Sequence, residues 1–235
     1  MSLTQRPPNR LLQALPAAEF DALNPHLDTV AMARETVLVE AGSAPARIYL
    51  PHSGAVSMTT RLSAGQMVEV AMIGKDGLVG ASAALGAEIW PSDAVVLIPG
   101  TASVLDVAEL KAAADRNDTV RNLLARHELA LFVQAQQSAA CNASHSVEAR
   151  LSRWLLRARD LHGDEALPLT QEFLARMIGV RRNAISIVAH SLRKAGTIRY
   201  SRGRIAIANV EALRRTACEC YHAVKAAHDR LLSAP

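Results

Sequence analysis

The stretch 168–208 constrains the fold most, because glycines divide it into short segments of different periodicity. Thr170 suits the N-cap of a first helix, and Gly179 just beyond that helix tolerates a positive φ. A second helix begins near Arg181 or Arg182, runs to Lys194 and is stopped by Gly196. A helix, a glycine-containing turn and a second helix describe a helix-turn-helix.

Two short strands are expected to follow this motif. Residues 197–200 and 204–208 alternate in hydrophobicity around the basic tip Ser201-Arg202-Gly203, which predicts a wing. The helical periodicity also predicts which side chains face inward. These are Phe173, Leu174 and Met177 in the first helix, and Ala184, Ile185, Val188 and Leu192 in the second.

The second helix of such a motif enters the DNA major groove, and its N-terminal residues meet base edges. Arg182 and Asn183 occupy that end, and both side chains can bind bases through two hydrogen bonds. Ser186, one turn later, can reach a base or a phosphate. The residues expected to contact phosphates are Arg181, Thr170, Gln171, Arg202 and Arg204. Taken singly, an arginine on a helix is more often a solvated surface residue than a contact.

The net charge of +4 hides a strong asymmetry along the chain. In residues 146–235 there are 16 basic and 8 acidic side chains, whereas residues 1–145 carry 10 basic and 14 acidic ones. A basic segment of this size is typical of a module that meets phosphates. A membrane surface or an acidic partner would suit it as well.

The front of the chain has a different pattern. Residues 10–24 have helical spacing, punctuated by Pro16. From about Val30 to Leu110, short apolar runs alternate with Gly, Pro, Asn and Ser turns, which predicts an antiparallel β-sandwich or barrel. The runs are 37–39, 48–50, 68–73 and 94–98.

Residues 108–144 then predict one or more helices. Within them Val120, Leu124, Leu131, Ala135 and Ser138 recur at spacings close to a coiled-coil seam. This stripe suits a second copy of the helix, and it suits packing on the chain's own β-domain equally well.

A further helix is expected at 147–161, ended by His162-Gly163-Asp164. The predicted division of the chain is a β-rich domain at 1–115, a long helical segment at 116–145 and a winged helix-turn-helix domain at 146–235. The fold class is α+β.

The chain resembles the Crp/Fnr family of bacterial transcription regulators over nearly its whole length. The resemblance rests on Leu169–Glu172, on Gly179–Asn183 and on Arg202–Ile205, and on the order of the predicted elements. It implies that 1–115 form an antiparallel β-roll sensor domain, that 116–145 form the dimerisation helix of a homodimer, and that the operator is roughly palindromic. RNA polymerase is a candidate protein partner.

Two departures from the family pattern limit what the resemblance implies. Asn183 and Ile187 stand where members that read TGTGA-type half-sites carry Glu and a second Arg. Ala81 stands where cyclic-nucleotide-binding members carry a ribose-binding Glu, and Ser92 or Asp93 where they carry the phosphate-binding Arg. No arginine occurs between Arg61 and Arg116, so a bound cyclic phosphate would lack its best hydrogen bonds. We expect no control by cyclic AMP.

Other candidate sites are weaker. Gly74–Gly80 lacks the spacing of a phosphate-binding loop and is interpreted as roll turns. An iron–sulfur cluster is not expected, because it requires about four cysteine thiolates and the chain has three. Cys218 and Cys220 are two residues apart in the last predicted helix, so they would not share one face. Cys141 is expected to be a small core or interface residue. The histidines at positions 26, 52, 127, 145 and 190 each stand alone, which predicts no metal and no cofactor. Only His127, if it lay on a dimer seam, would repel its copy when protonated.

Two alternative functions remain open at this stage. One is a small-molecule or redox sensor whose winged module contacts protein, and the other is an enzyme with a DNA-binding tail. The first has no need for Arg181, Arg182 and Asn183 at a helix N-terminus, and the second needs a polar catalytic cluster that 30–110 does not display. The N-terminus lacks a signal peptide and no apolar run could span a membrane, so we expect a cytoplasmic protein.

Overall fold

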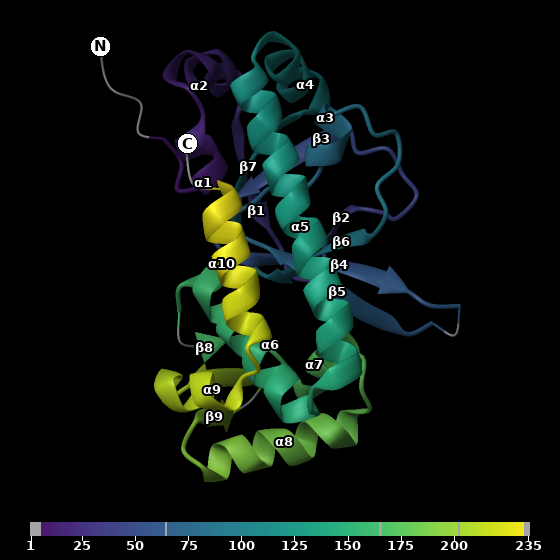
Figure 1. The fold of residues 1–235 in the computed structure, drawn as a ribbon, viewed down its shortest axis with the longest axis vertical. Coiled ribbons are helices and arrows are strands. Elements are labelled where there is room, and N and C mark those ends of the chain that lie inside the picture. Colours follow the sequence, from purple (N-terminus) through teal and green to yellow (C-terminus); the bar gives the residue numbers. More distant parts are fainter. Residues whose placement is uncertain (1–5, 64, 165, 202, 233–235) are drawn as a thin grey trace.

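The N-terminal half of the chain folds into a β-roll. The computed structural model describes residues 6–63, 65–164, 166–201 and 203–232. One antiparallel sheet of the roll has the strand order β1-β7-β3 and the other the order β2-β6-β4-β5 (Figure 1). The strands are β1 (Asp28–Met32), β2 (Val37–Val39), β3 (Arg47–Pro51), β4 (Ala55–Arg61), β5 (Met67–Ile73), β6 (Asp93–Ile98) and β7 (Gly100–Asp106). Each apolar run expected to be a strand lies within or overlaps one of them.

Short helices lie at one end of the roll. Asn9 caps the first of them, accepting hydrogen bonds from the backbone N–H groups of Leu11 and Leu12. Pro16 separates it from the second, as its missing N–H predicts. The helices are α1 (Arg10–Ala14), α2 (Ala17–Leu23), the 3₁₀ turn η1 (Asn24–His26), α3 (Ala81–Ala84) and α4 (Val107–Arg116).

A long helix, α5 (Asp118–Ser144), runs along the side of the roll toward the other end of the molecule (Figure 1). Asn117 separates it from α4 and caps it, accepting a hydrogen bond of 2.8 Å from the N–H of Thr119. The prediction of one or more helices over 108–144 is therefore confirmed, with two. No helix within the described residues is long and apolar enough to cross a membrane.

The C-terminal part is a helical domain with a small sheet. Gly163, at φ 87°, ends its first helix in the left-handed region. Its sheet has the order β8-β10-β9. The elements are α6 (Val147–His162), β8 (Ala166–Leu167), α7 (Gln171–Ile178), α8 (Arg182–Lys194), β9 (Ile198–Ser201), β10 (Arg204–Ile207), α9 (Val210–Thr216) and α10 (Cys220–Leu232). α10 returns along α5 toward α1 (Figure 1).

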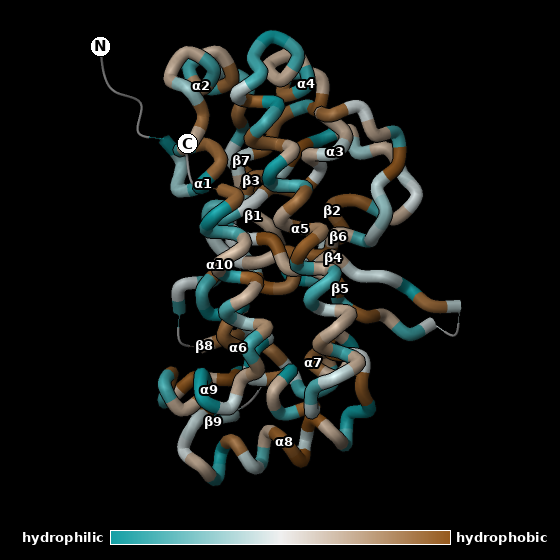
Figure 2. Tube along the Cα trace, in the orientation of Figure 1, coloured by the Kyte–Doolittle hydropathy of each residue, from teal (hydrophilic) through white to brown (hydrophobic). Residues whose placement is uncertain are grey.

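The interior of the roll is filled by apolar side chains. Brown, hydrophobic segments follow its strands in Figure 2. Trp90 is 1% exposed and packs with Val56, Ile73 and Val96 from the sheets. Leu131 of α5 joins the same cluster, so α5 closes the roll on that side.

The residues of α5 that were predicted to form a dimer seam face the chain's own core, which corrects that prediction. Val120 and Leu124 pack with the N-terminal helices, Leu131 packs in the roll, and Ser138 is buried as well; Ala135 is half-buried. The alternative expectation, packing on the chain's own β-domain, describes them. His127 is also buried within the chain, with Nε2 2.9 Å from the carbonyl oxygen of Leu78, so it lies on no seam.

The two halves of the molecule meet at a buried ion pair. Arg157 of α6 donates a hydrogen bond of 2.6 Å to Asp76, which follows β5. Burial alone would raise the pKa of the Asp76 carboxyl, but the charge and hydrogen bond of Arg157, together with the charges of His228 and His127, outweigh it and the pKa falls to about 2. His228 of α10 lies 3.6 Å from the same carboxylate, and burial lowers its pKa to about 4. At neutral pH, Arg157 is therefore the cation that keeps Asp76 ionised.

A second polar contact joins the halves beside the first. Trp154 Nε1 donates a hydrogen bond of 2.8 Å to Glu69 Oε1, and Ser57 Oγ donates one of 2.7 Å to Glu69 Oε2. Burial raises the pKa of Glu69 from its ordinary value of 4.5 to about 7, although both hydrogen bonds oppose the rise. Around these contacts, roll residues such as Met72 and Leu97 share one apolar cluster with α6.

Replacing Asp76 by Asn should destabilise the protein strongly at pH 7. The substitution leaves Arg157 buried without its counter-charge, which costs about 3 kcal/mol or more. The matched control is Glu211→Gln, because the Arg214–Glu211 pair is equally short at 2.6 Å but exposed. The control should cost less than about 1 kcal/mol. Urea unfolding followed by tryptophan fluorescence measures both, and equal losses would contradict the importance of burial.

Replacing Glu69 by Gln should change how stability depends on pH. Folded Glu69 keeps its proton up to about pH 7, whereas the unfolded chain releases it near pH 4.5, so its stabilisation is complete below that pH and is lost as the pH rises to about 7. Wild type should therefore lose up to about 3 kcal/mol relative to Glu69→Gln over this range. His228 titrates in both proteins, so its contribution to the pH dependence of stability cancels in the difference between them. Parallel curves of unfolding free energy against pH would contradict the assignment.

Candidate nucleic-acid interface

The predicted helix-turn-helix is present as α7 and α8. Thr170 caps α7, since its Oγ1 accepts a hydrogen bond of 3.2 Å from the N–H of Phe173. Gly179 follows the helix at φ 69°, a conformation that favours glycine. Both predictions for the ends of the first helix are confirmed, and the second helix begins at Arg182 as expected.

The inward face of the motif agrees closely with its predicted pattern. Phe173, Leu174, Met177, Ile185 and Leu192 are buried. Ala184 and Val188 were expected to be buried and are half-buried, while Ala189 takes a fully buried place on α8. The core side of α8 is therefore turned slightly from the predicted stripe.

The start of α8 presents an exposed polar cluster. Arg181, Arg182 and Asn183 are all exposed. α8 lies across the end of the molecule furthest from α4 (Figure 1), so its outer face is open to a large partner. Guanidinium and amide groups at this end of a recognition helix are suited to base edges and phosphates.

Two other predicted contact residues bind each other. Ser186 Oγ donates a hydrogen bond of 2.8 Å to Gln171 Oε1 and so links α8 to the start of α7. Both side chains are half-buried. This contact helps to fix the angle between the helices.

The wing is a hairpin of β9 and β10. Arg204 pairs with Ser201 across it, and Ile205 pairs with Leu167 of β8 on the other side. Arg204 is exposed, as its predicted role requires. Arg202, the other basic residue predicted at the wing, lies outside the described residues.

Ile187 was missed among the candidate contacts. It is 71% exposed on the outer face of α8, one turn after Asn183. His190 is exposed one further turn along. An apolar side chain in this position can contact the methyl group of thymine. The signal in the sequence was an isoleucine outside the buried stripe of an otherwise polar helix face.

The turn of the motif rests on the roll. A groove of about 840 Å³ separates the start of α8 from the β4–β5 hairpin, and its lining includes Arg61, Met67, Arg181 and Arg182. At its base a Cβ on Gly179 would lie 3.0 Å from Val68 Cγ2. The placement of the recognition helix thus depends directly on the hairpin.

The glycine-rich segment after β5 serves close packing. A Cβ on Gly74 would lie 2.9 Å from Leu161 of α6, and one on Gly77 would lie 2.7 Å from His127 of α5. These glycines let both helices approach the roll, which supports their interpretation as turns. Ala81 and Ser92, in the region where a cyclic nucleotide would be held, are buried.

Four side chains that were expected to stand apart come together elsewhere. The potential ligand atoms of Cys141, His145, Cys218 and Cys220 all lie within 4.8 Å of one another. The expectation that His145 stands alone is therefore wrong. Cys218 precedes α10, so the helical geometry that was used to separate it from Cys220 does not apply.

Two family models match the chain in the expected order. The cyclic nucleotide-binding domain matches residues 29–117, and the Crp-like helix-turn-helix domain matches residues 149–216. Together they account for most of the chain. None of the curated protein sequences compared with the chain matches it significantly.

Solved structures share the fold at low sequence identity. FixK2 from Bradyrhizobium japonicum is 15% identical, with a TM-score of 0.70 over 82% of this chain and 98% of that one. A putative regulator of the Crp/Fnr family from Eubacterium rectale is 16% identical, with a TM-score of 0.67 over 88% and 96%. A regulator of the CRP family from Thermus thermophilus, TTHB099, is 20% identical, with a TM-score of 0.64 over 80% and 96%.

The domain matches and the order of the elements agree with the resemblance found in the sequence. The likeness to solved structures extends over both domains and the long helix between them. The chain belongs to the Crp/Fnr family of transcription regulators and carries a Crp-like helix-turn-helix as its DNA-binding domain.

Proposed function

We propose that this protein is a homodimer that binds a palindromic operator through α8 of each subunit, independently of cyclic AMP. The observation that carries the proposal is the exposed cluster Arg181, Arg182 and Asn183 at the start of α8. Arg182 and Asn183 would read bases, Arg181 and Arg204 would bind phosphates, and Ile187 would contact a thymine methyl group.

A second stripe on α5 supports the dimer. Exposed positions recur along the helix at alternating steps of three and four, the spacing of a coiled-coil seam. Leu129 and Phe132 at its centre are 48% and 58% exposed, which is unusual for side chains of their size. The α5 stripe consists of Asn122, Ala125, Leu129, Phe132, Gln136, Ala139 and Ala143. A two-fold axis beside it would bury each stripe against its copy.

The composition of the roll supports independence from cyclic AMP. Residues 62–115 contain no arginine, so the segment in which family members carry the phosphate-binding Arg offers no guanidinium to pair with a cyclic phosphate. Trp90 and Leu131 occupy the interior instead. A signal received elsewhere on the roll would reach α8 through the β4–β5 hairpin, against which the turn of the motif packs.

Selection from a random duplex pool tests this function directly. Purified protein, without added ligand, should enrich an inverted repeat whose half-sites are about 34 Å apart. A repeat enriched only after a cyclic nucleotide is added would contradict the independence from cyclic AMP. Salt-sensitive binding with no enriched sequence would contradict base reading by α8.

Arg182→Ala and Arg204→Ala should weaken DNA binding in different ways. Loss of a base contact at Arg182 should cost about 1–3 kcal/mol and relax the preference at one base pair of each half-site. Loss of a phosphate contact at Arg204 should weaken binding to all sequences and reduce the slope of log affinity against log salt by about one. Arg47→Ala, an exposed change on β3 of the roll, is the control and should do neither. Identical behaviour of the first two variants would contradict the assigned roles.

Phe132→Glu should separate the subunits. A carboxylate at the centre of the α5 stripe would be desolvated beside its copy, so the dissociation constant of the dimer should rise at least tenfold. Ile89→Glu is the matched control, because Ile89 is 64% exposed in a loop of the roll. Sedimentation equilibrium measures both. A Phe132→Glu variant that remains dimeric like the control would place the interface elsewhere.

A further inference from the structure

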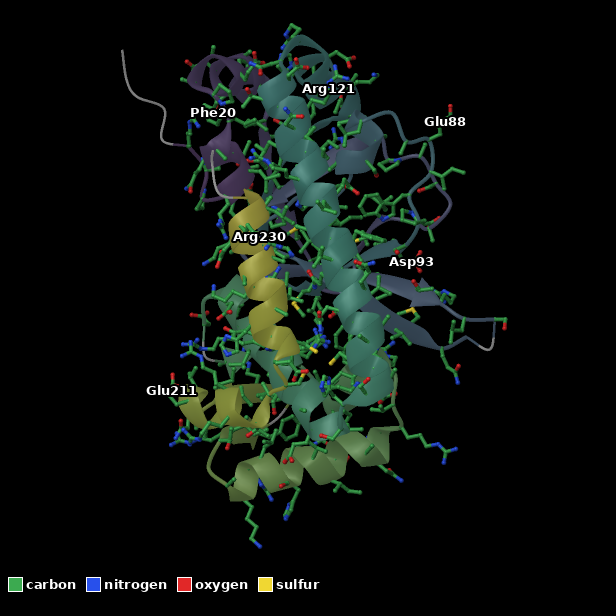
Figure 3. The ribbon with its side chains drawn as sticks, viewed as in Figure 1. Phe20, Glu88, Asp93, Arg121, Glu211 and Arg230 are labelled. Atoms are coloured by element: carbon green, nitrogen blue, oxygen red, sulfur yellow. The ribbon has the colours of Figure 1, made fainter. Side chains whose placement is uncertain are left out.

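Four potential metal ligands converge where α5 ends and α10 begins. Cys141 Sγ lies 3.5 Å from Cys218 Sγ, and Cys220 Sγ lies 3.6 Å from His145 Nδ1. The remaining separations among the four atoms are at most 4.8 Å. In Figure 3, sulfur atoms lie in this region between α10 and the end of α5 nearest α8.

Local geometry places each ligand. Cys141 and His145 are four residues apart, which puts both on one face at the end of α5. Cys218 lies in the turn after α9 and Cys220 is the first residue of α10, so the bend between them directs both thiols to the same point. The three thiols are buried, while His145 is half-buried and leaves a route from solvent.

The separations suit one tetrahedral ion. Bond lengths of 2.3 Å to sulfur and 2.0–2.1 Å to nitrogen give tetrahedron edges of about 3.5–3.8 Å. Two of the observed separations already have this length, and small side-chain rotations would close the others. Three cysteines and one histidine form a ligand set of structural zinc sites. In an iron–sulfur cluster the thiolates bind different irons, which requires a wider arrangement than this one.

The surroundings also fit a metal. His145 uses Nδ1 toward the thiols and its Nε2 lies 3.2 Å from Glu219 Oε1, an arrangement in which a carboxylate orients a histidine ligand. Gln137 Nε2 donates a hydrogen bond of 3.0 Å to Cys220 Sγ. Three thiolates around a divalent ion leave one negative charge, and the charges of Arg150 and Arg153 lie close enough to act on the thiols.

We propose that Cys141, His145, Cys218 and Cys220 form a structural site for Zn²⁺. The ion would fasten α10 to the end of α5, one residue before Ser146 begins the connection to α6. It would therefore fix the junction from which the helix-turn-helix domain extends. The consequence for operator binding rests on the proposed function, whereas metal binding itself is measured without DNA.

Metal content and cobalt substitution test the site on the full chain. Protein purified under a thiol-free reductant should contain one zinc per chain. Replacing the zinc by Co²⁺ should give the visible bands of a tetrahedral ion and thiolate-to-cobalt absorption in the near ultraviolet. Removing the metal with a chelator should lower the melting temperature, because binding to the folded state contributes to stability.

Variants assign the ligands. Cys141→Ser, Cys220→Ser and His145→Gln should each lose at least tenfold in Co²⁺ affinity, while His26→Gln, an exposed histidine on η1, should lose none. Glu219 is exposed, so Glu219→Gln should fold normally. It should keep one metal per chain and bind it about 10- to 100-fold more weakly, because His145 loses its orienting partner.

Three results would overturn the proposal. The first is Co²⁺ binding by wild type no tighter than by folded Cys141→Ser. The second is unchanged affinity in both His145→Gln and Glu219→Gln, which would place the metal elsewhere. The third is a native chain lighter by two hydrogens with a single titratable thiol, because a Cys141–Cys218 disulfide would then occupy the site.

Discussion

The buried ion pair between Asp76 and Arg157 decides where the C-terminal domain lies. The Arg157 side chain is largely removed from water, so a counter-charge stabilises it, and Asp76 supplies that charge from the roll. Apolar side chains from both halves continue around the pair in one cluster. Because α6 carries the rest of the C-terminal domain, fixing Arg157 also fixes α7, α8 and the wing. The direction in which the recognition helix faces is therefore a property of the contact between the halves.

α5 has apolar side chains on two faces, and this explains why its sequence was misinterpreted. Leu124 and Leu131 pack inward on the chain's own core, whereas Leu129 and Phe132 point outward. Both stripes have spacings near those of a heptad, so periodicity alone cannot distinguish the roll from a second subunit. Only the exposed fractions separate them. The proposed dimer therefore uses the face of α5 opposite to the one that closes the roll.

Features set by near neighbours in the sequence were predictable. The cap at Thr170, the left-handed Gly179 and the strands of the roll follow from residues a few positions apart. Contacts between distant segments were not. Cys141 and Cys218 are separated by 77 residues, and their meeting depends on α10 returning along α5. Nothing in the spacing of either cysteine indicates that return.

The junction between α5 and α6 is held from both sides. Before it, Cys141 and His145 contact the start of α10; after it, Trp154 and Arg157 are bonded to Glu69 and Asp76 of the roll. Turning α8 relative to the roll requires rotation at this junction, and that rotation must break the contacts on one side. Because Glu69 and Asp76 belong to the roll, their contacts with α6 couple the position of the C-terminal domain to the roll.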